Sequence, residues 1–389
     1  MQEDKKIPIV LVGHFPPSWR KMEEGSSIAG NQVQRRILSE IERLEVECIN
    51  VKCYSMTPMP CWPRGTLLSR SEREESIEFI GYLNLPIIKH IVFSARLAAR
   101  LLVSKPRLCL QYNSYLFENL GLIVLRLLRR SVALAIIIQD VNYVRENQLM
   151  TRAGLKSILE LASLSAAKHF DVIVPISSSI VSDFGICPAK SFIFQGGITD
   201  YAEELIAKRP SALDDIAVFA GALERHNGVD RLIDYWLRSD VRFPLHILGR
   251  GSLELRVAEA ASRSDRIVFH GFQSEGDVLR WQMKARWNLC LRYSDDINQK
   301  YFFPSKLFNI LCAPGMTIVN DFDGLNGDLK KYLHVVKDDL SDLANVLLST
   351  ADLLDAAVVD RRREALRLNC SWASCIKRIV EFSGILAGS

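Results

Sequence analysis

The chain has 389 residues, of which 48% are hydrophobic and 24% are charged, and its formal net charge is +4. This length is too great for one ordinary core and indicates two domains, and the composition excludes a disordered or low-complexity protein. The modest net charge argues against a protein that coats nucleic acid. Nine cysteines are scattered with no C-x-x-C pair and no matching histidine spacing, which indicates neither a disulfide framework nor a metal site.

The first six residues carry charges of both signs and run directly into a strand-like segment, Ile7–Val12. That segment is too short for the apolar core of a signal peptide. Nowhere does an apolar window approach the ~20 residues that a membrane-spanning helix needs. We therefore expect a cytoplasmic protein.

The first half alternates short β-branched runs with segments of helical periodicity, a rhythm typical of a parallel sheet with crossover helices. The predicted strands are Ile7–Val12, Val46–Cys53, Leu108–Tyr112, Ala133–Ile138 and Asp171–Pro175. The predicted helices cover about Asn31–Leu44, Leu85–Leu102, Phe117–Leu128 and Arg152–Lys168.

The second half repeats this rhythm. Its predicted strands are Ile216–Ala220, Leu245–Leu248, Ile267–His270, Trp287–Leu291, Met316–Val319 and Leu333–Val336. Its predicted helices lie near Val229–Leu237, Ser252–Ser262, Gly276–Ala285 and Ser305–Cys312. From about Leu340 onward only helical patterns remain.

A polar, proline-bearing stretch at 201–214 separates the halves and predicts a linker. The fold class is therefore α/β, with two doubly wound, Rossmann-like domains at residues 1–200 and 215–369. No predicted strand accompanies the last segment, 370–389, so its helix is not a crossover helix of the second domain. We therefore expect this helix to return to the first domain.

The segment 301–309 reads Tyr-Phe-Phe-Pro-Ser-Lys-Leu-Phe-Asn and joins a polar loop to an apolar helix. A proline and a serine at a helix start, followed by Lys306, bring backbone N–H groups and a cation together. Ligands of open α/β sheets collect at the strand ends, so the segment predicts an anion site. Plain helix capping is the alternative interpretation.

Glycine-rich turns follow other predicted strands. Gly249-Arg250-Gly251 closes one strand, residues 221–228 hold another glycine turn, and the stretch 25–31 leads into the first helix. Each fits either a tight turn or a ligand contact. The spacing is neither G-x-G-x-x-G nor that of a P-loop, which argues against those sites, but together with Lys306 the turns favour a ligand with phosphates.

These segments resemble a known family, the large group of GT-B-fold glycosyltransferases that use nucleotide-sugars, especially those that build bacterial polysaccharides and lipid-linked glycans. The resemblance covers nearly the whole chain, and its most specific part is Phe303-Pro304-Ser305-Lys306-Leu307. It implies two Rossmann-like domains that face a central cleft, with the acceptor on the first and a nucleoside-diphosphate sugar on the second. The implied activity is transfer of the sugar to a hydroxyl of a lipid-linked or polysaccharide acceptor, with retention at the anomeric carbon.

The resemblance also implies donor-binding positions. They are Gly30, Arg225, Gly249, Arg250, Gly251, Ser305, Lys306 and Asn309. Where the family commonly has an Arg and, some five residues later, a Lys, this chain has Ala222 and Asn227, so that Arg225 or Arg250 would substitute. Where the family has a Glu that bonds the ribose, this chain has Asn309, which still accepts a hydrogen bond.

No cofactor is implied besides the nucleotide-sugar co-substrate, and no metal is expected. Asp321-Phe322-Asp323 resembles a D-x-D metal motif, but it follows a predicted strand as a turn. For catalysis, Asp140 follows a buried-looking strand and is suited to orient an acceptor hydroxyl or to act as a base, whereas a turn aspartate is the alternative. His14, after the first strand, is the second catalytic candidate.

Leucines and basic residues interleave in the first half. The basic residues are Arg96, Arg100, Lys105, Arg107, Arg126, Arg129 and Arg130. They predict either solvated helix faces or a peripheral contact with anionic lipid at the inner face of the membrane. Two other functions stay open: a catalytically degenerate GT-B protein that binds a glycan or partner, and a nucleotide-sugar epimerase.

Overall fold

The computed structural model describes residues 7–18, 28–44, 49–141, 152–198, 202, 212–294, 299–322, 325, 327–349 and 356–385. It divides into two compact units. Unit 1 comprises Met1–Phe194 together with Trp372–Ser389, and unit 2 comprises Gln195–Ser371. Most of the predicted linker at 201–214 lies outside the described residues.

Unit 1 is built on a seven-stranded sheet with the order β3-β4-β2-β1-β5-β6-β7. Its strands are β1 Ile7–Gly13, β2 Ile49–Ser55, β3 Glu72–Glu74, β4 Ile77–Phe79, β5 Leu108–Tyr112, β6 Ala133–Ile138 and β7 Val172–Pro175. All neighbouring strands are parallel except the β3–β4 pair at the edge. That pair was not predicted from the sequence because β3, Glu-Arg-Glu, has none of the apolar alternation that marks a strand.

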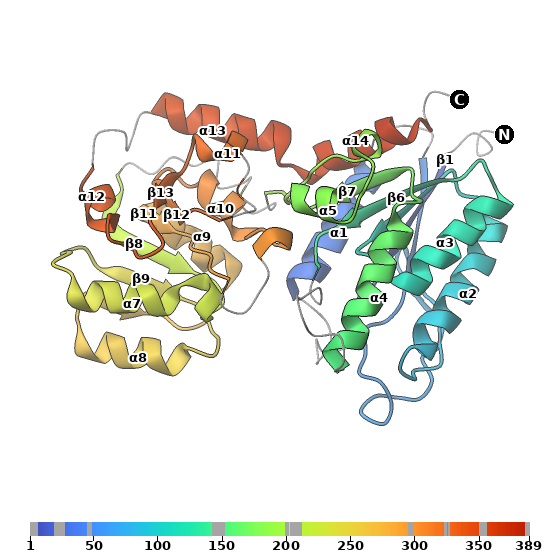
Figure 1. Ribbon diagram of the computed structural model, residues 1–389, viewed down its shortest axis with the longest axis horizontal. Helices are drawn as coiled ribbons and strands as arrows, with labels where there is room; N and C mark the ends of the chain where they lie inside the picture. Colours follow the sequence, from blue (N-terminus) through green and yellow to red (C-terminus); the bar gives the residue numbers. More distant parts are fainter. Residues whose placement is uncertain are drawn as a thin grey trace. The chain divides into compact units, whose positions relative to one another are not determined.

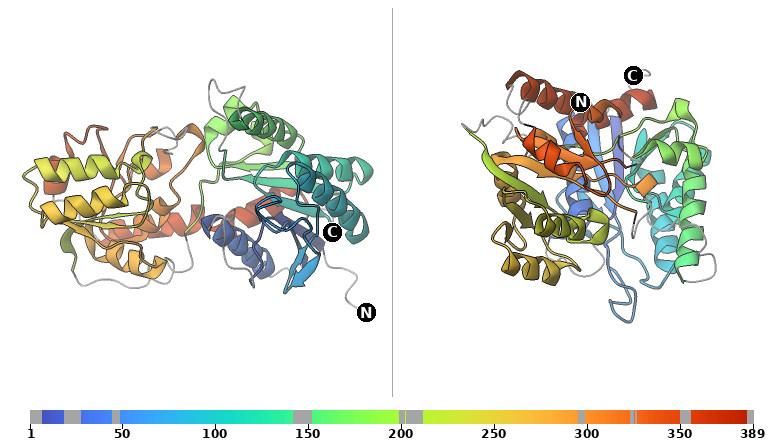
Figure 2. Two further views of the ribbon diagram at one scale, coloured as in Figure 1. Left: turned by 90° about the horizontal axis from the view of Figure 1, so that it is seen from below. Right: turned by 60° about the vertical axis from the view of Figure 1, so that its left-hand side comes forward.

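The helices of unit 1 are α1 Ile28–Arg43, α2 Ile88–Ser104, α3 Leu116–Leu128, α4 Arg152–Ala167, α5 Ser178–Asp183 and α14 Trp372–Ser383, with a 3₁₀ turn, η2, at Pro188–Lys190. Neighbouring helices α2, α3 and α4 lie side by side on one face of the sheet (Figure 1), and α1 lies on the opposite face (Figure 2, left).

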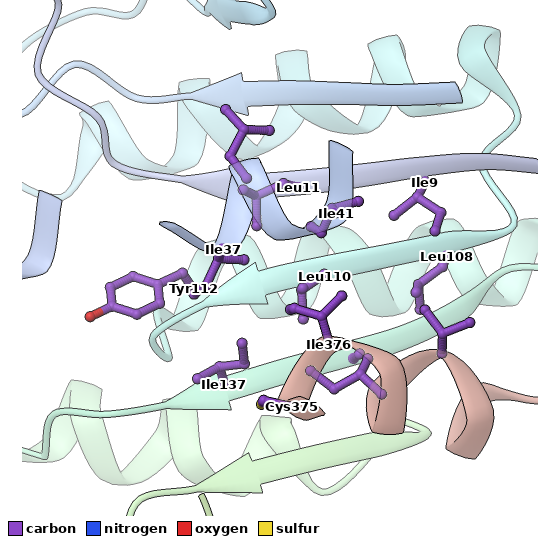
Figure 3. Packing of buried hydrophobic residues seen from close by; sticks show 14 of the residues in the cluster. Ile9, Leu11, Ile37, Ile41, Leu108, Leu110, Tyr112, Ile137, Cys375 and Ile376 are labelled. Atoms are coloured by element: carbon purple, nitrogen blue, oxygen red, sulfur yellow. The ribbon is translucent and has the colours of Figure 1, made fainter. Parts of the chain in front are cut away.

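A hydrophobic core of unit 1 lies under α1 and α14. Alternate residues of β1 and β5 point into it, so that Ile9 and Leu11 meet Leu108 and Leu110 beneath these two helices (Figure 3). Ile376 of α14 is 1% exposed in this cluster. At the start of α14 the Trp372 ring lies 4.8 Å from that of Phe194, measured between centroids. The last helix is therefore an integral layer of unit 1.

Unit 2 is built on a six-stranded sheet with the order β10-β9-β8-β11-β12-β13, in which every pair is parallel. Its strands are β8 Asp214–Ala220, β9 Leu245–Leu248, β10 Ile267–Phe269, β11 Ala285–Leu289, β12 Met316–Asn320 and β13 His334–Val336. Its helices are α7 Val229–Arg238, α8 Glu254–Arg263, α9 Glu275–Lys284, α10 Lys306–Cys312, α11 Gly327–Lys330, α12 Leu343–Leu348 and α13 Ala356–Asn369, with 3₁₀ turns η3 Arg225–Asn227 and η4 Gln299–Tyr301.

Helix α10 is held at its C-terminal end by α13. Arg362 donates a hydrogen bond to the carbonyl of Ala313, and Arg363 Nε donates to the carbonyl of Cys312 at 3.0 Å. These carbonyls end a helix and have no helical partner, so the two buried guanidinium groups satisfy them. Because α10 begins with Lys306, this clamp fixes the position of the predicted anion-binding residue.

Among the described residues, we find no helix that combines the length and the apolar character needed to cross a membrane.

Candidate functional site

In unit 2, the glycine turns after β8 and β9 pack directly on each other. The amide of Leu223 donates to the carbonyl of Arg250 at 2.9 Å, and that of Leu253 donates to the carbonyl of Leu223 at 3.0 Å. Gly249 has φ +144°, and a Cβ there would lie 1.9 Å from the carbonyl oxygen of Gly221. A Cβ at Gly251 would lie 2.6 Å from the carbonyl oxygen of Leu223. Close packing of the two turns therefore already requires glycine at both positions.

Lys306 lies against the first of these turns. Its Nζ is buried, has no hydrogen-bond partner among the described residues, and lies 4.4 Å from the centroid of the Phe219 ring. Gly221 makes room for it, since a Cβ there would lie 2.9 Å from Nζ. Burial lowers the pKa of Lys306 to about 8, Cys290 opposes this shift, and Arg292 adds to it by like charge. The lysine therefore stays protonated at neutral pH although no described residue serves as its counter-ion.

Sequence reasoning missed Arg292, which lies beyond the carboxyl end of β11. Its NH1 donates to Asn227 Oδ1 at 2.7 Å, and Asn227 Nδ2 donates to the carbonyl of Ala222 at 2.8 Å. Burial lowers the pKa of Arg292. Its place after an apolar strand was the available signal, because polar residues at such ends meet at one edge of a parallel sheet.

The other predicted donor-binding residues are spread over the same region of unit 2. Arg225 and Arg250 are exposed, and the Arg250 guanidinium lies 4.7 Å from the centroid of the Phe272 ring. Ser305 is the N-cap of α10 and its side chain makes no capping hydrogen bond. Asn309 lies half-buried one turn into α10. The charge of Arg292, an arginine that the sequence did not propose, acts on Lys306.

The D-x-D-like motif is only partly described. Asp321 Oδ1 forms an ion pair with Lys330 Nζ at 2.9 Å, and Asp323 lies outside the described residues.

In unit 1, a cavity of about 330 Å³ opens where β5 and β6 end. Its walls come from the β5–α3 and β6–α4 connections, from the first turn of α3, from α4 and from the start of α2. The lining residues are Ile87, His90, Asn113, Ser114, Tyr115, Leu116, Phe117, Glu118, Asp140, Lys156, Leu159, Glu160 and Ser163. Asp140 was predicted, and the cavity lies at the sheet edge where its strand ends.

Asn113 orients Asp140. This asparagine has φ +60°, and its Nδ2 donates to Asp140 Oδ2 at 3.0 Å. Its Oδ1 accepts from the amides of Gln139 at 2.9 Å and Asp140 at 3.3 Å. Desolvation raises the pKa of Asp140, and the hydrogen bond from Asn113 partly offsets that shift. Asn113 directly follows a predicted strand. Because polar residues at the carboxyl ends of parallel strands meet at one edge of the sheet, the sequence could have identified it as a site residue.

Two histidines share one buried carboxylate beside this cavity. Glu118 Oε1 lies 3.0 Å from His90 Nδ1 and 3.5 Å from His14 Nε2. Burial raises the pKa of Glu118, but the hydrogen bonds with His14 and then His90 outweigh it and bring the value to about 2. Burial lowers the pKa of His14, whose ring stacks on Tyr115 with centroids 4.2 Å apart. At neutral pH the cluster therefore holds a carboxylate beside a neutral His14.

The sequence carried no signal for Glu118, which looks like an ordinary glutamate in an apolar helix. His14 was predicted, but it is not among the lining residues. It contacts two residues that do line the cavity, Glu118 and Tyr115. Gly30 was expected in the loop before the first helix. It lies instead in the first turn of α1, because the helix begins at Ile28 rather than Asn31, and its carbonyl accepts from Gln34 Nε2 at 3.2 Å.

No protein-family model matches this sequence, and no curated protein does. Solved structures do match. The chain is similar to the α,α-trehalose-6-phosphate synthase of Burkholderia multivorans, with a TM-score of 0.62 at 11% identity over 98% of this chain and 97% of that one. It is also similar to WaaG, a glycosyltransferase involved in lipopolysaccharide biosynthesis (TM-score 0.60, 13% identity, 98% and 100% covered). Anabaena HepE in complex with UDP matches with a TM-score of 0.54 at 10% identity (98% and 97% covered).

The chain has the GT-B fold. The two parallel-sheet units of this GT-B chain confirm the predicted fold class. The identities are low enough that the likeness establishes the fold alone, so the chemistry of this GT-B protein has to be argued from its own residues.

Proposed function

We propose that the chain is a glycosyltransferase that moves a sugar from a nucleoside diphosphate to a hydroxyl of a lipid-linked or polysaccharide acceptor, with retention at the anomeric carbon. One observation carries the proposal most: the buried ammonium of Lys306 has no counter-ion among the described residues, at the edge of a parallel sheet. Keeping such a charge desolvated is costly unless an anionic ligand binds there. The HepE structure, which contains UDP, supports a nucleotide as that ligand.

A departing nucleoside diphosphate gains negative charge in the transition state. A fixed, desolvated cation aimed at it stabilises that charge more than it stabilises the intact donor, and this lowers the barrier. Lys306 and Ser305 would face the diphosphate, with the turn at Gly249–Gly251 beside them, and Asn309 would accept a hydrogen bond from the ribose.

The cavity of unit 1 is the proposed acceptor site. Its amide, carboxylate and hydroxyl groups suit a polyhydroxylated ligand, and its volume of about 330 Å³ falls in the range of small-molecule sites. Asp140 would orient the acceptor hydroxyl or accept its proton, because Asn113 holds the carboxylate in place and desolvation makes it more basic. His14 would act as a positioning residue behind Tyr115 and Glu118.

Exposed apolar side chains on the helices beside this cavity support a lipid-linked acceptor. On α3, Leu120, Val124 and Leu127 are all exposed and share one helical face. On the adjacent α4, Leu155 and Ile158 are also exposed. These residues form what we term the α3–α4 apolar surface, and we propose that it rests on the membrane.

Five of the seven predicted basic residues divide into two groups. Arg100 pairs with Glu78 and Arg126 with Asp171, whereas Lys105, Arg107 and Arg130 are exposed. The exposed cations suit anionic headgroups, so we place the protein peripherally on the cytoplasmic face of the membrane.

A second candidate function is a degenerate GT-B protein that binds a glycan or a partner without turnover. Ala222, Asn227 and Asn309 favour it, because none of them supplies the charge that the resemblance implies at its position. A measurement of turnover distinguishes the two functions, because only the enzyme hydrolyses or transfers the sugar.

The decisive experiment incubates the protein with a panel of UDP-, GDP-, ADP- and CMP-linked sugars and follows hydrolysis, transfer and thermal shift. We expect a thermal shift with one nucleoside diphosphate, and Lys306→Ala should lower turnover by roughly tenfold or more. Lys284→Ala, at the exposed end of α9, is the matched control and should leave turnover unchanged. No hydrolysis, transfer or thermal shift with any compound would reject the proposal, and binding without turnover would favour the degenerate protein.

A further inference from the structure

Unit 2 holds two half-buried cationic side chains, Lys306 and Arg292, whose charges repel each other. Lys306 Nζ and Arg292 Nε both lack a hydrogen-bond partner within the described part of the chain. Arg292 is linked to the turn beside Lys306: it donates to Asn227, Asn227 donates to the carbonyl of Ala222, and Lys306 lies against the adjacent Gly221. In keeping with this, the charge of Arg292 lowers the pKa of Lys306. Within the described residues, neither group forms a salt bridge, and burial raises the pKa of the nearby Cys290 thiol. A pair of uncompensated buried cations is unstable unless an anion joins it.

Arg292 is held in a defined position. NH1 donates to Asn227, whose own amide donates to the carbonyl of Ala222. The backbone of Arg292 is fixed from the other direction by Asn320, whose Oδ1 accepts from the Arg292 amide at 2.7 Å and whose Nδ2 donates to the Arg292 carbonyl at 2.6 Å. With NH1 engaged by Asn227, Nε is left as a donor for a ligand.

The contacts of Arg292 lead to the two positions at which this chain departs from the family it resembles. Ala222 and Asn227 stand where that family commonly has an Arg and a Lys, and the guanidinium of Arg292 binds one of them directly. A lysine at 227 would meet this guanidinium with like charge. An asparagine accepts its hydrogen bond instead, so the residues at 227 and 292 fit together as a pair.

We propose that Arg292 supplies the second cation that binds the diphosphate, together with Lys306, and that the charge absent from positions 222 and 227 is thus restored from the segment after β11. This inference rests on the proposed function and names the residues of its donor site. The diphosphate oxygens would accept from Lys306 Nζ and Arg292 Nε, so that the ligand supplies the negative charge that these cations lack. Asn227 is a positioning residue in this arrangement.

The test is isothermal calorimetry with UDP, GDP and ADP, their parent nucleosides and inorganic pyrophosphate. Arg292→Gln should weaken binding of the preferred nucleoside diphosphate by roughly tenfold or more, because a charge-assisted hydrogen bond is lost, and should leave nucleoside binding unchanged. Arg292→Lys should keep part of the affinity. Arg280→Gln, an exposed arginine of α9, is the matched control, and circular dichroism of each variant checks that it folds.

A charge-swap variant separates ligand binding from a purely structural role. Asn227→Lys alone should weaken diphosphate binding, because two cations then face each other. Asn227→Lys combined with Arg292→Gln should recover affinity relative to either single variant, since the cation is moved rather than removed. A role in packing alone predicts that the double variant is worse than both.

The outcomes separate this inference from the proposed function. If the wild type binds a nucleoside diphosphate and Arg292→Gln binds it equally well, or if Arg225→Gln or Arg250→Gln causes the loss instead, the inference is wrong and the function stands. If the wild type binds pyrophosphate through Arg292 but binds no nucleotide, the paired-cation site stands and the proposed function falls. Failure to bind any of these anions overturns both.

Discussion

The ammonium of Lys306 lies 4.4 Å from the centroid of the Phe219 ring, with no carboxylate paired to it in the described part of unit 2. A cation over an aromatic face gains some electrostatic stabilisation, but less than it loses by leaving water. In the absence of ligand this arrangement therefore destabilises the fold, and that cost can be measured.

Lys306→Met should stabilise the unliganded protein at pH 7 by up to ~3 kcal/mol, because an apolar side chain of similar length replaces an unpaired buried charge. The folded-state pKa is about 8, against an ordinary value of 10.5. Between these values the unfolded chain binds more protons than the native one, so wild-type stability rises with pH in this window. The variant should lack that rise in urea denaturation measured from pH 7 to 10. A variant less stable than wild type at pH 7 would contradict the interpretation.

Glu118→Gln should remove part of the acid sensitivity of unit 1. The folded-state pKa of Glu118 is about 2 against an ordinary 4.5, so its contribution to stability is full above pH 4.5 and is lost as the pH falls toward 2. We expect the variant to be ~2 kcal/mol less stable than wild type at pH 6, and the difference to shrink by pH 3. Glu254→Gln, at an exposed position in unit 2, is the control. An equal difference at both pH values would show that charge is not the cause.

Asn113→Gly should move the acid limb of the pH–rate profile to higher pH. Glycine tolerates the φ of +60° at this position, so the change removes the side chain without straining the turn. The hydrogen bond from Asn113 lowers the pKa of Asp140, so its loss raises that pKa and protonates the carboxylate at a higher pH.

Asp140→Asn completes this comparison. It should lower turnover by roughly a hundredfold while leaving nucleoside-diphosphate affinity unchanged, because the proposed role of Asp140 is toward the acceptor. If Asp140→Asn turns over normally, Asp140 is a turn residue. If the acid limb does not move in Asn113→Gly, Asp140 is not the group that titrates.

Val124→Asp combined with Leu127→Asp should abolish co-sedimentation with vesicles that contain anionic lipid. The two side chains are 50% and 73% exposed on α3, and a charge at either prevents insertion into the headgroup region. Leu255 is an exposed apolar residue on α8 of unit 2 and provides the control. The Leu255→Asp variant should co-sediment with the vesicles as the wild type does. Wild-type binding that shows no preference for anionic over zwitterionic vesicles would remove the membrane proposal.

Most of the sheet framework could be predicted from the sequence, because buried parallel strands need continuous apolar runs. The strands Leu108–Tyr112, Ala133–Ile138 and Leu245–Leu248 have the predicted bounds at both ends. The antiparallel β3–β4 edge escaped prediction, since an edge strand is partly solvated and can be polar. Helix α1 begins earlier than predicted, and this moved Gly30 from a loop into a helical turn.

The residues of the candidate site also differ in whether the sequence alone could identify them. Lys306, Asp140 and His14 were identifiable because each is marked by its local position at a strand end or helix start. Nothing local marks Glu118, whose role depends on two histidines from distant segments.

The sequence by itself determined that this chain forms two α/β halves, because the spacing of apolar runs decides which segments are buried strands and which are helices. It also marked Lys306 and the glycine turns near it. Only the tertiary structure decided which charges meet. Arg292 and Asn227 are far apart in the chain, and their hydrogen bond exists because β11 lies next to β8 in the sheet. Burial then left Lys306 Nζ and Arg292 Nε without a hydrogen-bond partner in the described residues, a property that depends on desolvation and therefore on the folded surroundings.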